Sequence, residues 1–156
     1  MTLRTLASLA LCVLLPALAG CDRAPTGVAL RTDDQAVLAR GEAVYRAQCA
    51  SCHGANLQGQ PNWRVRDASG RLPAPPHDAS GHTWHHPDQL LFAIVKHGVG
   101  KAAGLKDYDS AMPAYDGVLS DADIVAVLSW IKSRWPADVR RQQEQIDAAA
   151  RSQGRD

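Results

Sequence analysis

The segment "CASCHG", residues 49–54, places two cysteines three positions apart and a histidine directly after the second. Four kinds of site use such a pair: a redox-active dithiol, half of a zinc site, a short disulfide, or an attachment point for haem. The rest of the chain decides among them, because each alternative needs particular partners or a particular fold around the motif.

Two of the four cysteines belong to an N-terminal targeting segment. Arg4 precedes an apolar run over residues 6–17, which has the length of a signal-peptide core and is too short to span a bilayer well. The run ends in "LAGC", residues 18–21, which resembles the lipobox of bacterial lipoproteins. We therefore expect a signal peptide over residues 1–20, cleaved before a lipid-modified Cys21. An ordinary signal peptide or an uncleaved anchor, with Cys21 incidental, is the alternative.

These features predict export to the periplasmic side of a bacterial membrane. Asp22 favours the inner membrane, because an aspartate after the lipidated cysteine favours retention there in many proteobacterial lipoproteins.

The chain of 156 residues has 17 Lys and Arg against 16 Asp and Glu, and cleavage after residue 20 removes only Arg4. The mature chain is then formally neutral, which gives no electrostatic footprint for nucleic acid and no strong steering of a charged partner.

Once Cys12 and Cys21 are set aside, Cys49 and Cys52 have no other cysteine to pair with. A zinc ribbon needs a second ligand pair, a thioredoxin-like dithiol needs a βαβ context, and so short a disulfide loop stabilises little. The pattern C-x-x-C-H is the signature of covalent c-type haem attachment, which suits an exported chain. We predict one haem c, held by thioethers from Cys49 and Cys52, with His53 as the proximal iron ligand.

Hydrophobic periodicity predicts a helix that leads directly into this motif. Thr32 and Asp33 are the expected N-caps, and one face of the helix carries Val37, Gly41, Val44, Tyr45 and Gln48. A glycine inside a helix costs roughly 1 kcal/mol relative to alanine. Gly41 therefore predicts a close crossing with another helix.

Two further core helices are expected. One covers residues 88–97 and stops at Gly98; the other begins at Ser120 with Asp123 in a capping-box position and is closed by Pro136. The inward stripe of the last helix consists of Ile124, Val127, Leu128 and Ile131.

The segments between and around these helices lack a clear period. Residues 56–87 and 99–119 are expected to be long loops. Long ordered loops are usually functional or wrapped around a bound group, and a haem would be that group here. Residues 21–32 are expected to be a tether, residues 33–136 the folded domain, and residues 137–156 a charged, partly helical and weakly packed tail. No transmembrane segment is expected after the signal peptide.

The second axial position of the iron separates a carrier from a catalyst. Met112 is the only methionine left in the mature chain, and it lies in a loop before Pro113 and the last core helix. A thioether ligand opposite histidine raises the reduction potential and fills the coordination sphere. We predict that Met112 is the distal ligand; the alternative is a methionine that fills a gap in the core.

"CASCHG" followed by "NLQG", together with "MPAYDGVLSDADIVAVLSWIKSRWP", resembles bacterial class I c-type cytochromes over roughly residues 33–136. The resemblance implies an all-α fold, the small cytochrome c fold, with three core helices and long loops wrapping one haem. It also implies that the first and last core helices cross near the haem edge. In that family a proline carbonyl often accepts the proximal imidazole N–H, and Pro75 and Pro76 are the two candidates here.

The chain departs from a minimal member of that family in the histidine-rich segment from Trp63 to His86. Imidazoles suit copper, zinc and nickel, so this segment admits a second metal site. The simpler interpretation is a hydrogen-bonding loop around the haem propionates, to which Trp63 and Trp84 would donate. The candidate metal ligands are His77, His82, His85 and His86. We interpret His97 as a partner of a helix dipole.

The combined prediction is a periplasmic electron carrier, tethered to the membrane by lipid on Cys21, that moves single electrons and is not an enzyme. Its partners would be other redox proteins, a terminal oxidase or a dehydrogenase, met through small transient interfaces. Two alternatives stay open: a haem sensor or enzyme with a displaceable Met112, and a copper-handling haem protein.

Overall fold

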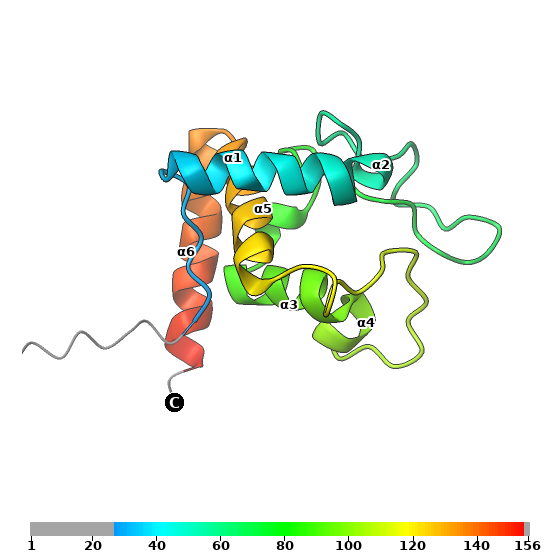
Figure 1. Cartoon of the computed structure of the whole chain (residues 1–156). Helices are drawn as coiled ribbons and strands as arrows, with labels where there is room; N and C mark the ends of the chain where they lie inside the picture. Colours follow the sequence, from blue (N-terminus) through cyan, green and yellow to red (C-terminus); the bar gives the residue numbers. More distant parts are fainter. Residues whose placement is uncertain (1–26, 155–156) are drawn as a thin grey trace, which may run out of the picture.

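The computed structural model describes residues 27–154, and within them all regular structure is helical, with no strand (Figure 1). This confirms the expected all-α fold. The expected signal peptide and Cys21 lie outside the described residues. The elements, in chain order, are α1 (Gln35–Val44), η1 (Tyr45–Cys49), α2 (Ala50–His53), η2 (Thr83–His85), α3 (Asp88–His97), α4 (Val99–Ala102), α5 (Asp121–Ser133) and α6 (Ala137–Gln153).

The first helical segment runs without a break from α1 through η1 into α2, as the sequence predicts. Its N-cap is Asp34 rather than Thr32 or Asp33, because the Asp34 carboxylate accepts hydrogen bonds from the Ala36 and Val37 amides. The middle piece, η1, is a π-helix, in which the Ala50 amide donates to the Tyr45 carbonyl. This wider turn ends the predicted inward face at Tyr45 and leaves Gln48 exposed.

The close helix crossing predicted at Gly41 is present, between α1 and α5. A β-carbon at Gly41 would lie 2.1 Å from the Ala126 carbonyl oxygen, so only glycine allows this approach. Next to it, the Tyr45 ring packs on Trp130 with centroids 4.8 Å apart. The buried core continues along α5 with its predicted stripe, Ile124, Val127, Leu128 and Ile131.

The other two core helices have the predicted ends. α3 stops at Gly98, which has a φ of 85°, and α5 starts at Ser120 with a complete capping box to Asp123. Asp123 also accepts a 2.6 Å hydrogen bond from Arg40 of α1, so the cap of α5 is tied to the helix that crosses it.

The Asp123 carboxylate is expected to make stability depend on pH. Its hydrogen bonds, first from Arg40 and then from Ser120, lower the pKa of Asp123 from 3.8 to about 2. Because the folded-state pKa lies below the unfolded one, the stabilisation is present above about pH 4 and is lost as pH falls through about 2. We expect Asp123→Asn to lower the free energy of unfolding at pH 7, because it removes the charge that pairs with Arg40. The expected loss is only about 1 kcal/mol, because the pair is partly exposed to solvent.

Urea unfolding at pH 7 and near pH 2 measures this difference, which should shrink toward zero at the lower pH. Asp121→Asn is the control, because Asp121 pairs with Lys96 while 65% exposed. An Asp123→Asn difference of the same size at both pH values would contradict the assignment.

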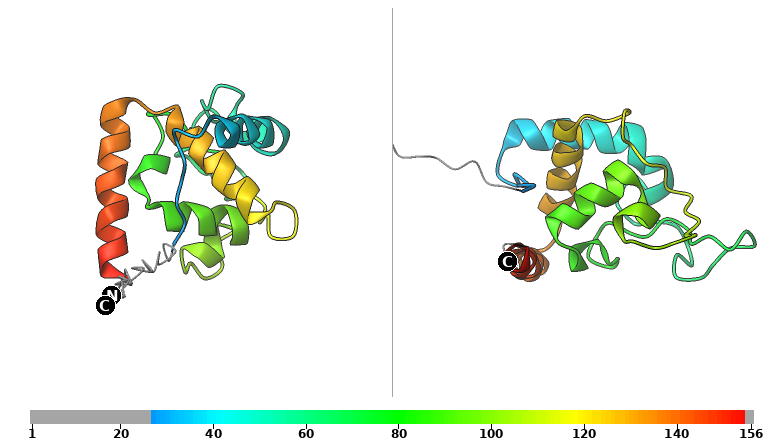
Figure 2. Two further views of the ribbon diagram at one scale, coloured as in Figure 1. Left: turned by 60° about the vertical axis from the view of Figure 1, so that its left-hand side comes forward. Right: turned by 90° about the horizontal axis from the view of Figure 1, so that it is seen from below.

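The expected charged tail is helical, as predicted in part, but it packs more closely than predicted. Residues 137–153 form one continuous helix, α6, which stands against the side of the bundle next to α3 (Figures 1 and 2). Gln143 and Asp147 are buried, with exposed fractions of 0% and 3%. Both are polar, which hides the contact from a search for apolar stripes; their partners are residues of α3 and of the loop before it.

The end of the expected tether also contacts the domain. The Val28 amide donates to Gln89 of α3, and the Arg31 amide donates to the Ser129 hydroxyl of α5. Leu30 packs against the core between these contacts. Residues 27–32 therefore lie along the domain surface instead of forming a free linker. No helix within residues 27–154 is long and apolar enough to cross a membrane.

Candidate haem site

The two cysteines of the motif lie on a short helical turn at the end of the first helical segment. Cys49 ends η1 and is partly buried, Cys52 lies in α2 and is exposed, and both thiols are free. Burial, with a smaller contribution from Cys52, raises the pKa of the Cys49 thiol to about 11. A redox-active dithiol needs a lowered thiol pKa, so this environment disfavours that alternative.

His53 is placed as a neutral ligand with one nitrogen available. Its Nδ1 lies 2.8 Å from the Pro75 carbonyl oxygen, which can only accept, so the proton must be on Nδ1 and Nε2 keeps a free lone pair. Burial lowers the pKa of His53, against the opposing effect of the Pro75 hydrogen bond. A neutral imidazole with a fixed tautomer is the form that binds iron.

The choice of Pro75 over Pro76 follows from how closely the loop packs on the motif. A β-carbon at Gly59 would lie 2.4 Å from the Pro76 nitrogen, and one at Gly81 would lie 2.0 Å from the Pro76 carbonyl oxygen. The two glycines thus enclose the Pro75–Pro76 backbone. With the Pro76 carbonyl directed at Gly81 and Thr83, the Pro75 carbonyl is the one that faces His53.

Two tyrosines hold the backbone around the motif, a role that the sequence analysis did not assign. The Tyr45 hydroxyl donates to the Gly54 carbonyl, and the Tyr115 hydroxyl donates to the Gln48 carbonyl, both at 2.8 Å. Tyr115 bears directly on the predicted distal ligand, because it lies three residues after Met112. Its hydroxyl ties the Met112 loop to the helical segment that carries Cys49.

Met112 lies on the loop between α4 and α5, and its side chain is partly buried. The Tyr115 and Asp116 amides donate to the carbonyls of Val95 and Lys96 at the end of α3. The loop is therefore attached to α3 and, through Tyr115, to the helical segment that also carries Cys49 and His53. Met112 thus belongs to a separate part of the chain that is tied to the motif.

The four histidines of the long loop do not form one cluster. His85 stacks on Trp84 and His77 stacks on His53. His82 stacks on Trp63, and the His86 ring packs edge-on against it with centroids 5.5 Å apart. Within residues 27–154, no three His, Cys, Asp or Glu side chains come together as a metal site requires. No observation therefore favours a copper site.

The two tryptophans expected to donate to haem propionates have contacts within their own loop. The Trp84 indole N–H donates to the Ala79 carbonyl, and the Trp63 ring contacts the His82 ring and the Arg64 guanidinium. His97 ends α3, with Nδ1 3.8 Å from an Asp116 carboxylate oxygen. That position at the helix C-terminus agrees with a dipole partner.

The residues fit a covalently attached haem. Two free thiols lie three residues apart on one helical turn, and the next residue offers an imidazole whose Nε2 is unprotonated. Cys49 and Cys52 would hold the group by thioethers and His53 would bind the iron. The residues suit haem better than zinc, because a structural Zn²⁺ site needs four converging thiolates, imidazoles or carboxylates, and within residues 27–154 no three His, Cys, Asp or Glu side chains converge in this way.

Residues 36–131 match the family model described as cytochrome C oxidase, cbb3-type, subunit III. The matched region begins at the second residue of α1 and ends inside α5, so it includes the CASCH motif and Met112 but not α6. No curated protein and no solved structure matches the chain.

Proposed function

Because the chain belongs to the c-type cytochrome family described as cytochrome C oxidase, cbb3-type, subunit III, we propose that it is a membrane-tethered carrier of single electrons with one haem c. The family supports covalently bound haem and haem-based electron transfer. The observation that carries the assignment is the His53 imidazole, whose Nδ1 is held by Pro75 so that Nε2 is free to bind iron beside Cys49 and Cys52.

In this proposal the bound haem supplies a single site that alternates between ferric and ferrous iron. The chain's own residues do the rest. Cys49 and Cys52 would keep the group attached, His53 and Met112 would bind its iron, and Pro75 fixes the proton on His53. With two side chains bound to the iron, no position would be left for a substrate, so the proposed role is that of a carrier and not of an enzyme.

The N-terminal sequence supports the proposed location, and the family description supports the proposed partners. We propose cleavage after residue 20, lipid on Cys21, and a site of action on the periplasmic face of the inner membrane. Tethering raises the effective concentration near membrane partners. The family's printed description names an oxidase subunit, so a terminal oxidase is the first partner to test, and a periplasmic dehydrogenase is the second.

The mass of the intact protein purified from membranes tests haem number, cleavage and lipidation together. We expect residues 21–156 plus one haem and a lipid increment, and a redox titration that follows a single one-electron step. Changing Cys49 and Cys52 together to alanine should remove the haem increment alone, and Cys21→Ala should remove the lipid. A protein that carries no covalent haem would contradict the function, whereas an unlipidated N-terminus would contradict only the location.

A further inference from the structure

A second imidazole lies face to face with the predicted proximal ligand. The rings of His53 and His77 are stacked, with centroids 3.9 Å apart and planes inclined by 21°. His77 comes from the loop that also supplies Pro75, so one short segment contacts His53 both at its Nδ1 and across its ring face.

His77 is itself held from three directions. Its Nδ1 lies 2.9 Å from the hydroxyl of Thr83, which is 6% exposed. Its backbone amide donates to the Leu57 carbonyl, and its own carbonyl accepts a 2.7 Å hydrogen bond from the Trp135 indole. The position of this ring is thus set by contacts other than the one with His53, which lets it act as a fixed wall.

His53 needs such a wall because its hydrogen bond controls the ring only in part. The Pro75 carbonyl sets the tautomer, but hydrogen bonds to carbonyl oxygens accept a broad range of directions. The χ2 torsion of histidine is also broad, so the imidazole plane can rock about its bond to the β-carbon. A flat ring packed at 3.9 Å on one face restricts that rocking.

We propose that His77 is a positioning residue that fixes the plane of the iron-binding imidazole of His53, and that Thr83 holds the His77 ring in the required orientation. This inference rests on the proposed function, since it assumes that His53 binds haem iron. It assigns His77 a role distinct from that of His82, His85 and His86, whose rings contact Trp63, Trp84 and one another rather than His53.

The test is proton NMR of the ferric protein with cyanide bound opposite His53. Cyanide is linear and has no plane of its own, so the four haem-methyl shifts report the orientation of the His53 ring. It also occupies the position assigned to Met112, which makes the result independent of that assignment. The variants are His77→Ala, which removes the wall, His77→Phe, which keeps a flat ring, and Thr83→Val, which removes the anchor.

His85→Ala is the matched control, because His85 belongs to the same loop, is exposed and stacks on Trp84. We expect His77→Ala to change the spread or order of the haem-methyl shifts and His85→Ala to stay near wild type. Thr83→Val and His77→Phe both lose the hydrogen bond between these residues but keep a flat ring, so each should cause a smaller change in the same direction. A wild-type pattern in His77→Ala would overturn the proposal. So would a shift in His77→Phe or in His85→Ala as large as that in His77→Ala.

If His77→Ala does not incorporate haem, Thr83→Val decides, and an unchanged pattern there overturns the proposal. Different results contradict the proposed function and the positioning role of His77. A wild-type protein without covalent haem contradicts the proposed function, whereas a wild-type protein with haem whose shifts ignore His77 and Thr83 contradicts only the positioning role.

Discussion

Replacing Met112 with alanine is expected to lower the reduction potential and to open the distal side of the iron. A thioether opposite histidine stabilises the reduced haem relative to other axial ligands, and axial ligands spread haem potentials over about 0.8 V in all. We expect a fall on the order of a few tenths of a volt, together with loss of the absorption band that marks methionine–iron coordination in the oxidised protein. The reduced variant should bind carbon monoxide readily.

The structure predicts that this loss is one of coordination and not of folding. The Met112 loop is held by backbone hydrogen bonds to α3 and by the Tyr115 hydroxyl on Gln48, none of which involves the methionine side chain. Met112→Leu keeps the apolar volume without the sulfur and should behave like Met112→Ala. Leu105→Ala is the control, because Leu105 lies on the same loop with 48% of its surface exposed.

Two results would contradict the proposed function as an electron carrier with Met112 bound to the iron. Unchanged spectra in both Met112 variants would remove Met112 from the coordination sphere. Ready binding of carbon monoxide by the reduced wild-type protein at neutral pH would favour the alternative of a sensor or enzyme with an open distal site.

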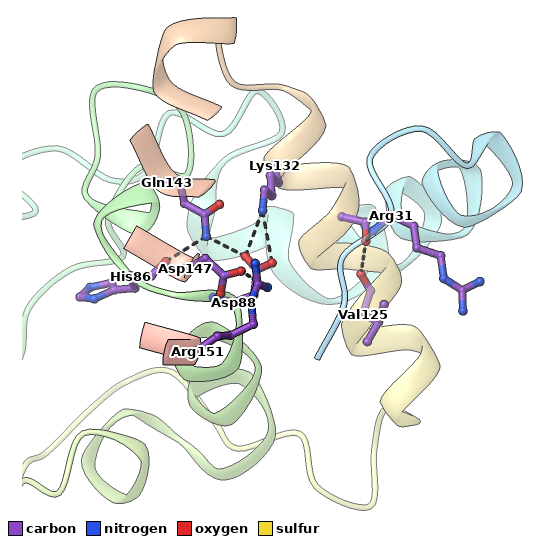
Figure 3. Close-up of polar contacts among 9 residues, drawn as sticks. Arg31, His86, Asp88, Val125, Lys132, Gln143, Asp147 and Arg151 are labelled. Atoms are coloured by element: carbon purple, nitrogen blue, oxygen red, sulfur yellow. Dashed lines mark hydrogen bonds and ion pairs between the residues drawn. The ribbon is translucent and has the colours of Figure 1, made fainter. Parts of the chain in front are cut away.

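Removing the charge of Lys132 is expected to cost about 3–5 kcal/mol of stability, because it would leave a buried carboxylate without its cation. Lys132 of α5 contacts both carboxylate oxygens of Asp88 at 3.2 Å, and the side chains are only 8% and 4% exposed (Figure 3). Burial raises the pKa of Asp88, and Lys132 acts against that rise. Lys132→Met retains most of the volume and removes the charge.

Lys96→Met is the matched control. Lys96 of α3 pairs with Asp121 of α5 at 2.7 Å, so it joins the same two helices, but this pair is 24% and 65% exposed. Exposed pairs contribute less than about 1 kcal/mol. Urea unfolding of the two variants at pH 7 measures the contrast, and equal losses would show that the Lys132–Asp88 pair does not behave as a buried one.

Asp88 of this pair is also the residue through which α6 is attached to the cytochrome domain. Gln143 donates to Asp88 at 2.7 Å and to the His86 carbonyl, and Asp147 accepts from the Asp88 amide, so it caps the N-terminus of α3 from a distant part of the chain (Figure 3). Arg151 pairs with Asp147. The loop that carries Pro75 and His77 ends at this junction, so α6 stabilises one end of the segment that positions His53.

Much of the fold and the site could be predicted from local sequence, because the features concerned depend on neighbours within a few residues. The capping box at Ser120, the stop at Gly98 and the run of the first helix into CASCH are of this kind. Gly41 is a partial exception. Its cost in a helix signals a crossing, but only the structure identifies Ala126 as the backbone that it meets.

What the tertiary structure decided depends on contacts between residues far apart in the chain. Pro75 and Pro76 are equivalent as acceptors in the sequence, and the path imposed by Gly59 and Gly81 selects Pro75. In the sequence, nothing distinguishes His77 from the other histidines of its loop. Only the structure shows that its ring stacks on the His53 ring. The polar residues of α6 implied an exposed tail, because burying a polar side chain costs free energy unless it gains hydrogen-bond partners. The partners of Gln143 Nε2 and of the Asp147 carboxylate lie 55 to 59 residues away in the chain.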